Sequence, residues 1–171
     1  MTGMMTDYRI ATRADLKSLW AFNIAENPGD DRWVRWRDEY IGYNQTGQAV
    51  TFTVAVDQKL VGEGTLLLSP SCGAIGGRAQ LADGQAVANV NALRMTKAYE
   101  GKGYMSALMR LMEAWAQTHG YQRLTIGVEA RETRNLAIYL HWGYQDYVMS
   151  AEEDGELVLY YAKDLKGMSD V

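Results

Sequence analysis

The sequence has few residues of the kinds that bind metals or form disulfides. Among its 171 residues there is one cysteine, Cys72, and there are two histidines, His119 and His141. A single cysteine excludes an internal disulfide, and neither histidine has a cysteine or acidic partner at ligand spacing. We therefore expect no metal site and no thiol catalysis, with Cys72 as an ordinary loop or core residue.

Long apolar runs and blocks of basic charge are also missing. No stretch approaches the roughly 18 apolar residues of a membrane-spanning helix. The first residues, MTGMMTDYR, lack the apolar core of a signal peptide. The net charge is −4, without a basic cluster, which argues against a nucleic acid or an anionic membrane as partner. We expect a soluble, cytoplasmic protein.

The length and composition predict one domain with a substantial core. A chain of 171 residues with 47% hydrophobic residues fits a single domain over 1–171, with its core at about 7–165. The chain has 5 tryptophans and 11 tyrosines, side chains that line polar-edged pockets as well as cores. Whether the protein forms a homodimer cannot be read from the sequence.

Hydrophobic periodicity predicts an alternation of strands and helices. The predicted strands are 8–12, 50–56, 60–68, 86–95, 124–129, 144–150 and 156–162. A first helix is expected after Asp15 as N-cap, and a second after Asp30 or Asp31. Residues 69–85 are irregular, either a small hairpin or a mobile loop, and the tail from Lys163 is expected to fray.

The stretch 93–115 is the most informative part of the chain. A β-like run leads into a turn that contains Gly101 and Gly103, and a helical pattern follows. Its apolar stripe consists of Met105, Leu108, Leu111, Met112 and Trp115, and Gly120 is expected to stop the helix. Backbone N–H groups at such a helix start, with the positive end of the helix dipole, form a site for a phosphate or another anion.

This turn resembles the signature of the Gcn5-related N-acetyltransferases, which is Arg or Gln, two residues, Gly, one residue, then Gly or Ala. Gly101, Lys102 and Gly103 match its common GKG form. Glu100 stands where Arg or Gln is usual, and Met105 where Gly or Ala is usual. The segment 130–148 resembles the second signature of the family, with Asn135 and Tyr139 ahead of a Gly-Tyr pair.

The resemblance implies a fold and an activity. The fold is α+β, with three α/β/α layers and a mixed, mostly antiparallel sheet that carries helices on both faces. The activity is transfer of the acetyl group of acetyl-CoA, by direct attack in a ternary complex. The implied acceptor is a primary amine of a small molecule, or a protein amino terminus. Neither a metal, a nucleic acid nor a membrane is implied.

The resemblance also implies roles for individual residues. Tyr139 is the expected general acid, protonating the sulfur of CoA. Asn91 stands where the family often has a glutamate base; its amide can order a water but cannot take a proton, so Glu63 is a substitute candidate. Trp33 and Trp36 are expected on the wall of the acceptor cleft, unless these aromatics are core. The expected CoA-binding residues are Leu93, Met95, Lys97, Gly101, Lys102, Gly103, Tyr104, Met105, Ser106 and Asn135.

Two alternatives stay open at this point. The departures at Glu100 and Asn91 are compatible with a CoA-binding sensor or an inactive relative. A mononucleotide-binding protein would also use a glycine-rich turn, but this turn lacks the Gly-Lys-Ser/Thr ending of a P-loop.

Overall fold

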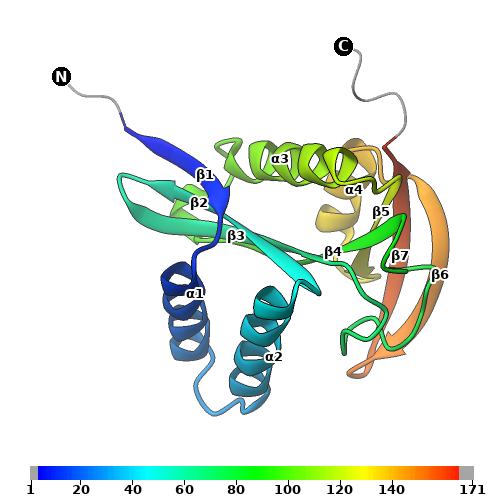
Figure 1. Cartoon of the computed structure of the whole chain (residues 1–171), viewed down its shortest axis with the longest axis horizontal. Helices are drawn as coiled ribbons and strands as arrows, with labels where there is room; N and C mark the ends of the chain where they lie inside the picture. Colours follow the sequence, from blue (N-terminus) through cyan, green and yellow to red (C-terminus); the bar gives the residue numbers. More distant parts are fainter. Residues whose placement is uncertain (1–3, 166–171) are drawn as a thin grey trace. The chain divides into compact units, whose positions relative to one another are not determined.

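The computed structural model describes residues 4–165, which form seven strands and four α-helices (Figure 1). The strands are β1 (Thr6–Ile10), β2 (Ala49–Val56), β3 (Lys59–Leu67), β4 (Val87–Met95), β5 (Arg123–Glu129), β6 (Asp146–Glu153) and β7 (Glu156–Asp164). The helices are α1 (Arg13–Glu26), α2 (Arg32–Thr46), α3 (Tyr104–Thr118) and α4 (Thr133–His141), with a short 3₁₀ turn η1 (Lys97–Tyr99). The predicted strands and helices are confirmed to within a few residues at each end.

The chain folds into two compact units, which are described separately. The first unit comprises the described residues up to Leu66 with Ala92–Met112, and the second comprises Leu67–Asn91 with the described residues from Glu113. Strands follow the order β1-β2-β3-β4 in the first unit and β4-β5-β7-β6 in the second. β4 and β5 are parallel, whereas β1–β2, β5–β7 and β6–β7 are antiparallel. The predicted α+β class with a mixed, mostly antiparallel sheet is confirmed.

Strand β4 changes unit at a residue with unusual backbone geometry. Ala92 has φ +53°, in the left-handed region that residues other than glycine rarely adopt. Such a residue interrupts the pleat of a strand, as a β-bulge does. The regular alternation of side chains between the two faces of β4 is therefore broken at Ala92.

In the first unit, β3 and β4 approach each other closely at two glycines. A Cβ at Gly62 would lie 2.6 Å from the Met95 Cε atom, and a Cβ at Gly64 would lie 2.8 Å from both Leu93 Cδ2 and Met112 Sδ. Because Met112 belongs to α3, the glycine face of β3 is the face that α3 covers (Figure 1).

Helix α1 begins differently from the prediction. Thr12 is the N-cap: its side chain accepts from the backbone N–H of Asp15 at 3.1 Å, and the Asp15 carboxylate accepts from the Thr12 N–H at 2.9 Å. The assignment of Asp15 as N-cap was therefore wrong by three positions. The two side chains form a capping box, in which Asp15 occupies the third helical position.

In the second unit, residues 69–85 pack instead of forming a hairpin. No strand occurs there, and four side chains of the segment are buried: Cys72, Ile75, Leu81 and Ala82. Asp83 Oδ1 accepts hydrogen bonds from the backbone N–H groups of residues 85, 86 and 87, which leads the chain into β4. The small hairpin expected as one alternative is thus absent from this described segment.

Two further predictions need correction. Lys163 and Asp164 belong to β7 and Leu165 is buried, with its N–H donating to Gln122 O at 2.8 Å, so the chain does not fray from Lys163. The rest of the predicted frayed tail lies outside the described residues.

In α3, Leu108 and Met112 are buried as expected, but Met105, Leu111 and Trp115 are only half-buried. Met109, Glu113 and Ala116 are buried in their place.

Candidate active site

The turn before α3 depends on glycine backbone geometry. Gly101 has φ +72° and Gly103 has φ +86°, both in the left-handed region that glycine adopts without steric cost. A Cβ at either position would meet no described protein atom within 4 Å. These glycines are therefore required by the course of the backbone, and the space beside them is open.

The start of α3 leaves backbone donors without a helical acceptor. The first α-helical hydrogen bond runs from Ala107 N–H to Gly103 O at 3.0 Å. The N–H groups of Tyr104, Met105 and Ser106 precede that bond and so point out of the helix start. With the positive end of the dipole of a 15-residue helix, they form the anion-binding geometry that the sequence predicts.

Positive charge gathers near the turn around Tyr99. The Nζ atoms of Lys59 and Lys102 each lie 5.9 Å from the centroid of its ring, and the ring of Tyr104 lies 6.2 Å away. Lys102 was expected at this turn from the sequence, whereas Lys59 was not, because nothing local in β3 relates it to a turn some 40 residues later. Lys97 and Glu100 are both exposed.

The opposite face of β3 in the first unit carries a buried carboxylate. Glu63 lies between the two glycines, and its Oε2 atom accepts from Asn23 Nδ2 at 2.9 Å. Its Oε1 atom lies 3.4 Å from Nη1 of Arg94 on β4, an ion pair without hydrogen-bond alignment. The carboxylate of Glu63 thus holds α1 and Arg94. Its role as a base stays a prediction.

An aromatic cluster surrounds the guanidinium of Arg94. Its Cζ atom lies 5.2 Å from the centroid of Trp20 and 4.9 Å from that of Trp33, and Trp33 contacts Trp36 at 5.1 Å. Trp20 is a buried core residue, whereas Trp33 and Trp36 are half-buried. A core position therefore fits Trp20 better than it fits Trp33 and Trp36, the two residues predicted to line the acceptor cleft. The sequence analysis did not name Arg94 as a functional residue.

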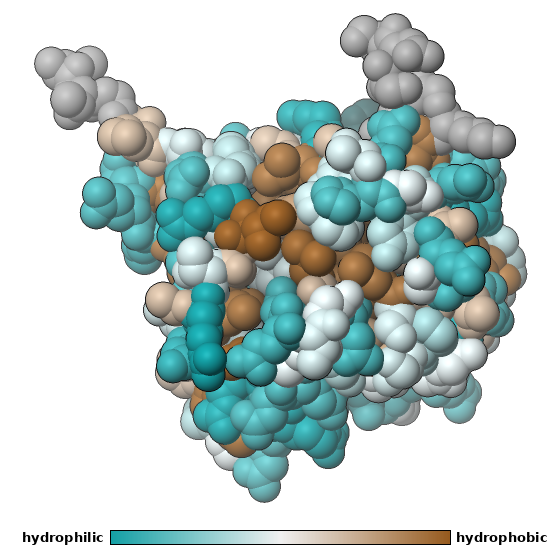
Figure 2. Space-filling model, viewed as in Figure 1, coloured by the Kyte–Doolittle hydropathy of each residue, from teal (hydrophilic) through white to brown (hydrophobic). Residues whose placement is uncertain are grey.

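The outer surface of α1 and α2, in the lower part of Figure 2, is mostly hydrophilic. Three acidic residues in or next to α2 are paired locally: Asp30 with Arg32, Asp38 with Arg37, and Glu39 with Arg35. The hydrogen bond from Arg32 lowers the pKa of Asp30 to about 2. These carboxylates form a solvated, self-neutralised surface and not an isolated acidic patch.

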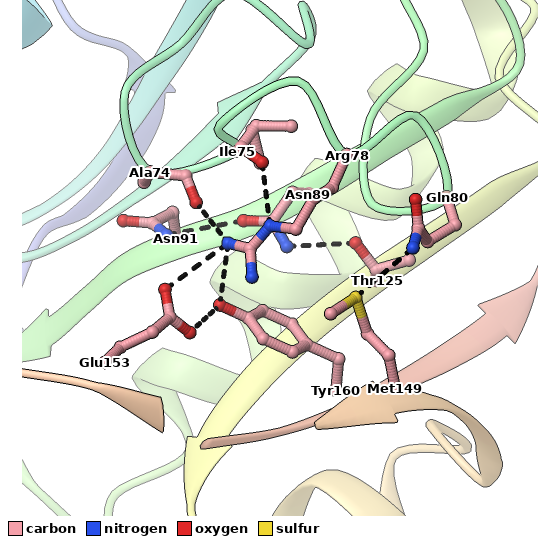
Figure 3. A network of polar contacts seen from close by, with 10 residues as sticks. All are labelled: Ala74, Ile75, Arg78, Gln80, Asn89, Asn91, Thr125, Met149, Glu153 and Tyr160. Carbon is pink, nitrogen blue, oxygen red and sulfur yellow. Dashed lines mark hydrogen bonds and ion pairs between the residues drawn. The ribbon is translucent and has the colours of Figure 1, made fainter. Parts of the chain in front are cut away.

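In the second unit, two asparagines of β4 belong to one hydrogen-bond chain (Figure 3). Asn91 Nδ2 donates to Asn89 Oδ1 at 3.3 Å, and Asn89 Nδ2 donates to Thr125 Oγ1 at 2.9 Å. Thr125 Oγ1 in turn donates to Leu81 O at 2.7 Å. Asn89 and Asn91 therefore share a face, and these hydrogen bonds hold the half-buried Asn91 side chain in one orientation.

A second network in the same unit was not expected from the sequence (Figure 3). Arg78 Nη2 donates to Ala74 O at 2.8 Å, to Glu153 Oε1 at 3.3 Å and to the Tyr160 hydroxyl at 3.4 Å. The Tyr160 hydroxyl donates to the other oxygen of Glu153. Burial, helped by Glu153, raises the pKa of Tyr160 to about 12. Only long-range contacts bring these residues together.

Helix α4 carries the second predicted cluster. Asn135 and Tyr139 lie one turn apart, and Asn135 Nδ2 donates to Glu132 Oε2 at 2.8 Å. Burial, with a smaller contribution from Glu132, raises the pKa of Tyr139 to about 12. Tyr139 therefore stays protonated at neutral pH, as a proton donor must.

Two kinds of feature are absent from the described part of the chain. Residues 4–165 contain no group of three or more histidine, cysteine, aspartate or glutamate side chains that could hold a metal ion. Within the same residues, every helix is too short or too polar to span a bilayer.

Comparison with solved structures shows which proteins share this fold. A YncA acetyltransferase from Salmonella typhimurium, solved with its cofactor acetyl-CoA, matches with a TM-score of 0.70 and 13% identity over 96% of each chain. A spermidine N-acetyltransferase SpeG chimera from Vibrio cholerae and hSSAT matches with a TM-score of 0.71 and 15% identity. The match covers 97% of this chain and 99% of that one. A ribosomal-protein-alanine N-acetyltransferase from Brucella melitensis matches with a TM-score of 0.68 and 17% identity, over 92% of this chain and 99% of that one.

The sequence comparisons decide the family. No curated protein matches the sequence significantly. The model of the acetyltransferase (GNAT) family matches residues 13–144, which include the glycine turn, α3 and α4. The chain therefore belongs to the GNAT family of acetyl-CoA-dependent N-acetyltransferases.

Proposed function

We propose that this acetyltransferase acetylates a primary amine of a small molecule or a protein amino terminus, by direct attack of the amine on acetyl-CoA. The observation that carries the proposal is the open turn with left-handed Gly101 and Gly103 at the start of α3. Solved structures of this fold include a spermidine N-acetyltransferase and a ribosomal-protein-alanine N-acetyltransferase. They support an amine acceptor without choosing between the two classes.

The first unit supplies the donor-binding groups in this proposal. Backbone N–H groups of residues 102–106 hold the diphosphate of CoA, and Lys97, Lys102 and Lys59 add positive charge. Backbone groups of Leu93 and Met95 pair with the pantetheine arm. Asn135 on α4 of the second unit stays a predicted CoA-binding residue. Glu100 is exposed, so its carboxylate can stay in solvent while the turn binds the diphosphate.

Acetyl transfer then requires three proton and charge movements. The neutral amine attacks the thioester carbonyl carbon, and a backbone N–H near Met95 stabilises the oxyanion. The carbon–sulfur bond breaks, and Tyr139 donates its phenolic proton to the leaving thiolate. The amine proton passes to a water ordered by Asn91, or to Glu63. Solvent restores the proton of Tyr139.

The second candidate is a CoA-binding sensor or inactive relative, favoured by Glu100 and Asn91 at two signature positions. A panel of amines with acetyl-CoA, assayed for free CoA thiol, separates the two proposals. We expect CoA release with at least one amine and micromolar to millimolar KM values. Acetyl-CoA binding by calorimetry without release from any amine would favour the sensor. Displacement of acetyl-CoA by ATP would instead favour a mononucleotide-binding protein.

A further inference from the structure

Arg94 is a partly buried cation with one buried donor, Nη1, that has no hydrogen-bond partner among the described residues. Its guanidinium makes no hydrogen bond to any residue in the described range 4–165, and Nη1 is a buried atom without such a partner. The ion pair with Glu63 at 3.4 Å balances its charge. An arginine carries five N–H donors, and buried donors are nearly always satisfied in a folded protein.

The side chain of Arg94 is still reachable from solvent. It keeps 29% of its surface exposed, and since Nη1 is buried this exposure belongs to the rest of the side chain. The rings of Trp20 and Trp33 lie about 5 Å from the guanidinium carbon, at cation–π distance. Because Nη1 is buried beside Glu63, a carboxylate would bind the planar guanidinium through its Nε and Nη2 edge.

The place of Arg94 in the first unit connects it with the reaction. Its neighbours Leu93 and Met95 contact the glycine face of β3, the face that α3 covers. Arg94 points to the other face, with Glu63, Trp20 and Trp33. The side chain next to the proposed thioester-binding backbone therefore emerges on the side of α1 and α2, where the half-buried Trp33 and Trp36 lie.

We propose that Arg94 is a specificity-determining residue that binds a carboxylate of the acceptor, so the substrate class is a primary amine bearing a carboxylate, such as an amino acid. This inference rests on the proposed acetyl transfer. Trp33 and Trp36 contact the apolar part of such an acceptor. Glu63 accepts a hydrogen bond from Asn23 and forms an ion pair with Arg94, so it orients the guanidinium. A polyamine would bring a second cation against Arg94 without a matching anion.

The test compares matched amines in the wild-type protein. Phenylalanine is paired with phenethylamine, leucine with 3-methylbutylamine, and each amino acid with its methyl ester, which keeps the amine and removes the carboxylate charge. For at least one pair we expect kcat/KM to be about 10- to 100-fold higher for the free acid, the scale of a charge-assisted hydrogen bond.

Two variants locate the preference at Arg94. In Arg94→Gln the ratio of kcat/KM values should fall toward one, with unchanged acetyl-CoA affinity by calorimetry. Arg94→Lys should retain part of the ratio because it keeps the charge without the planar fork. Arg35→Gln is the matched control: this α2 arginine is exposed and pairs only loosely with Glu39, at 3.8 Å. It should leave the ratio as in the wild type.

Two results would overturn the inference while leaving the acetyltransferase proposal intact. One is equal or higher kcat/KM for the decarboxylated amines and the esters. The other is an unchanged preference in folded Arg94→Gln and Arg94→Lys. If no amine of either kind releases CoA although acetyl-CoA binds, the proposed function fails, and this inference fails with it.

Discussion

The two units differ in how they satisfy their polar groups. In the second unit, Glu113 Oε2 accepts from the Tyr144 hydroxyl at 2.8 Å and from Lys163 Nζ at 3.0 Å, and Glu113 and Tyr144 are both buried. In the first unit, Arg94 has an ion pair but no hydrogen bond to the described residues, and the N–H groups at the start of α3 point out of the helix.

The difference separates polar groups that hold the fold from polar groups that can take a ligand. The Glu113, Asn89 and Arg78 networks of the second unit close on themselves within the protein. A closed network strengthens packing but offers a ligand little. The open groups of the first unit lie where the donor and acceptor of acetyl transfer are proposed to bind. Substitutions in the closed networks should accordingly change stability, and substitutions at the open groups should change binding.

The largest effect on stability is expected from Glu113→Met. Removing this buried carboxylate leaves the Lys163 ammonium and the Tyr144 hydroxyl without their partner. We expect a loss of about 3–5 kcal/mol in the free energy of unfolding, the scale for breaking a buried ion pair. Urea denaturation measures this loss. The double variant Glu113→Met, Lys163→Met should be more stable than the single one, and a smaller loss in the single variant would mean that the network contributes little.

Tyr139→Phe should be an exception to this contrast between the units, because Tyr139 lies in the second unit and is proposed to act in catalysis. Without its general acid, the enzyme should lose about 10- to 1000-fold in kcat. Acetyl-CoA affinity and the urea midpoint should change little. Steady-state kinetics measure kcat, and calorimetry measures acetyl-CoA affinity. Tyr147→Phe, at an exposed tyrosine of β6, is the control. Wild-type turnover in Tyr139→Phe would remove this residue from the mechanism.

Gly103→Asp should weaken acetyl-CoA binding, as expected for an open group of the first unit. Because a Cβ there meets no described protein atom, the carboxylate enters the space proposed for the diphosphate. We expect acetyl-CoA affinity to fall by about 10- to 100-fold, as charge repulsion of 1–3 kcal/mol would cause. Gly103→Asn is the isosteric control: it shares the left-handed strain without the charge, so it should bind better than the aspartate variant. Equal affinities would argue against a diphosphate at this turn.

The smallest effect is a loss of stability in alkali, and it should concern the second unit. Burial raises the pKa of Tyr139 and Tyr160 to about 12, and that of Tyr144 well above 10. Since a raised folded-state pKa favours the protonated form, this stability is present below pH 10 and is lost as pH rises toward 12. Absorbance of tyrosinate during a pH titration should show these phenols ionising late or upon unfolding. Ionisation of all tyrosines near pH 10 in folded protein would contradict the buried networks.

Local features of the fold and the glycine turn before α3 could be predicted from the sequence. The turn, the amphipathic α3 and the Asn135–Tyr139 pair are short-range patterns, and backbone sterics and helical periodicity act over a few residues. Boundaries were less certain, because Thr12 and Asp15 are both good caps and only their mutual hydrogen bonds identify the N-cap.

What the sequence determined by itself was the family and the donor, because a GKG turn before an amphipathic helix is written in consecutive residues. Only the tertiary structure decided the left-handed Ala92, the buried Glu113 network and the unsatisfied Arg94 among tryptophans. Arg94 and Glu63 are 31 positions apart, and nothing local indicates that they meet. Contacts of that kind depend on which strands become neighbours, and that depends on packing of the whole chain.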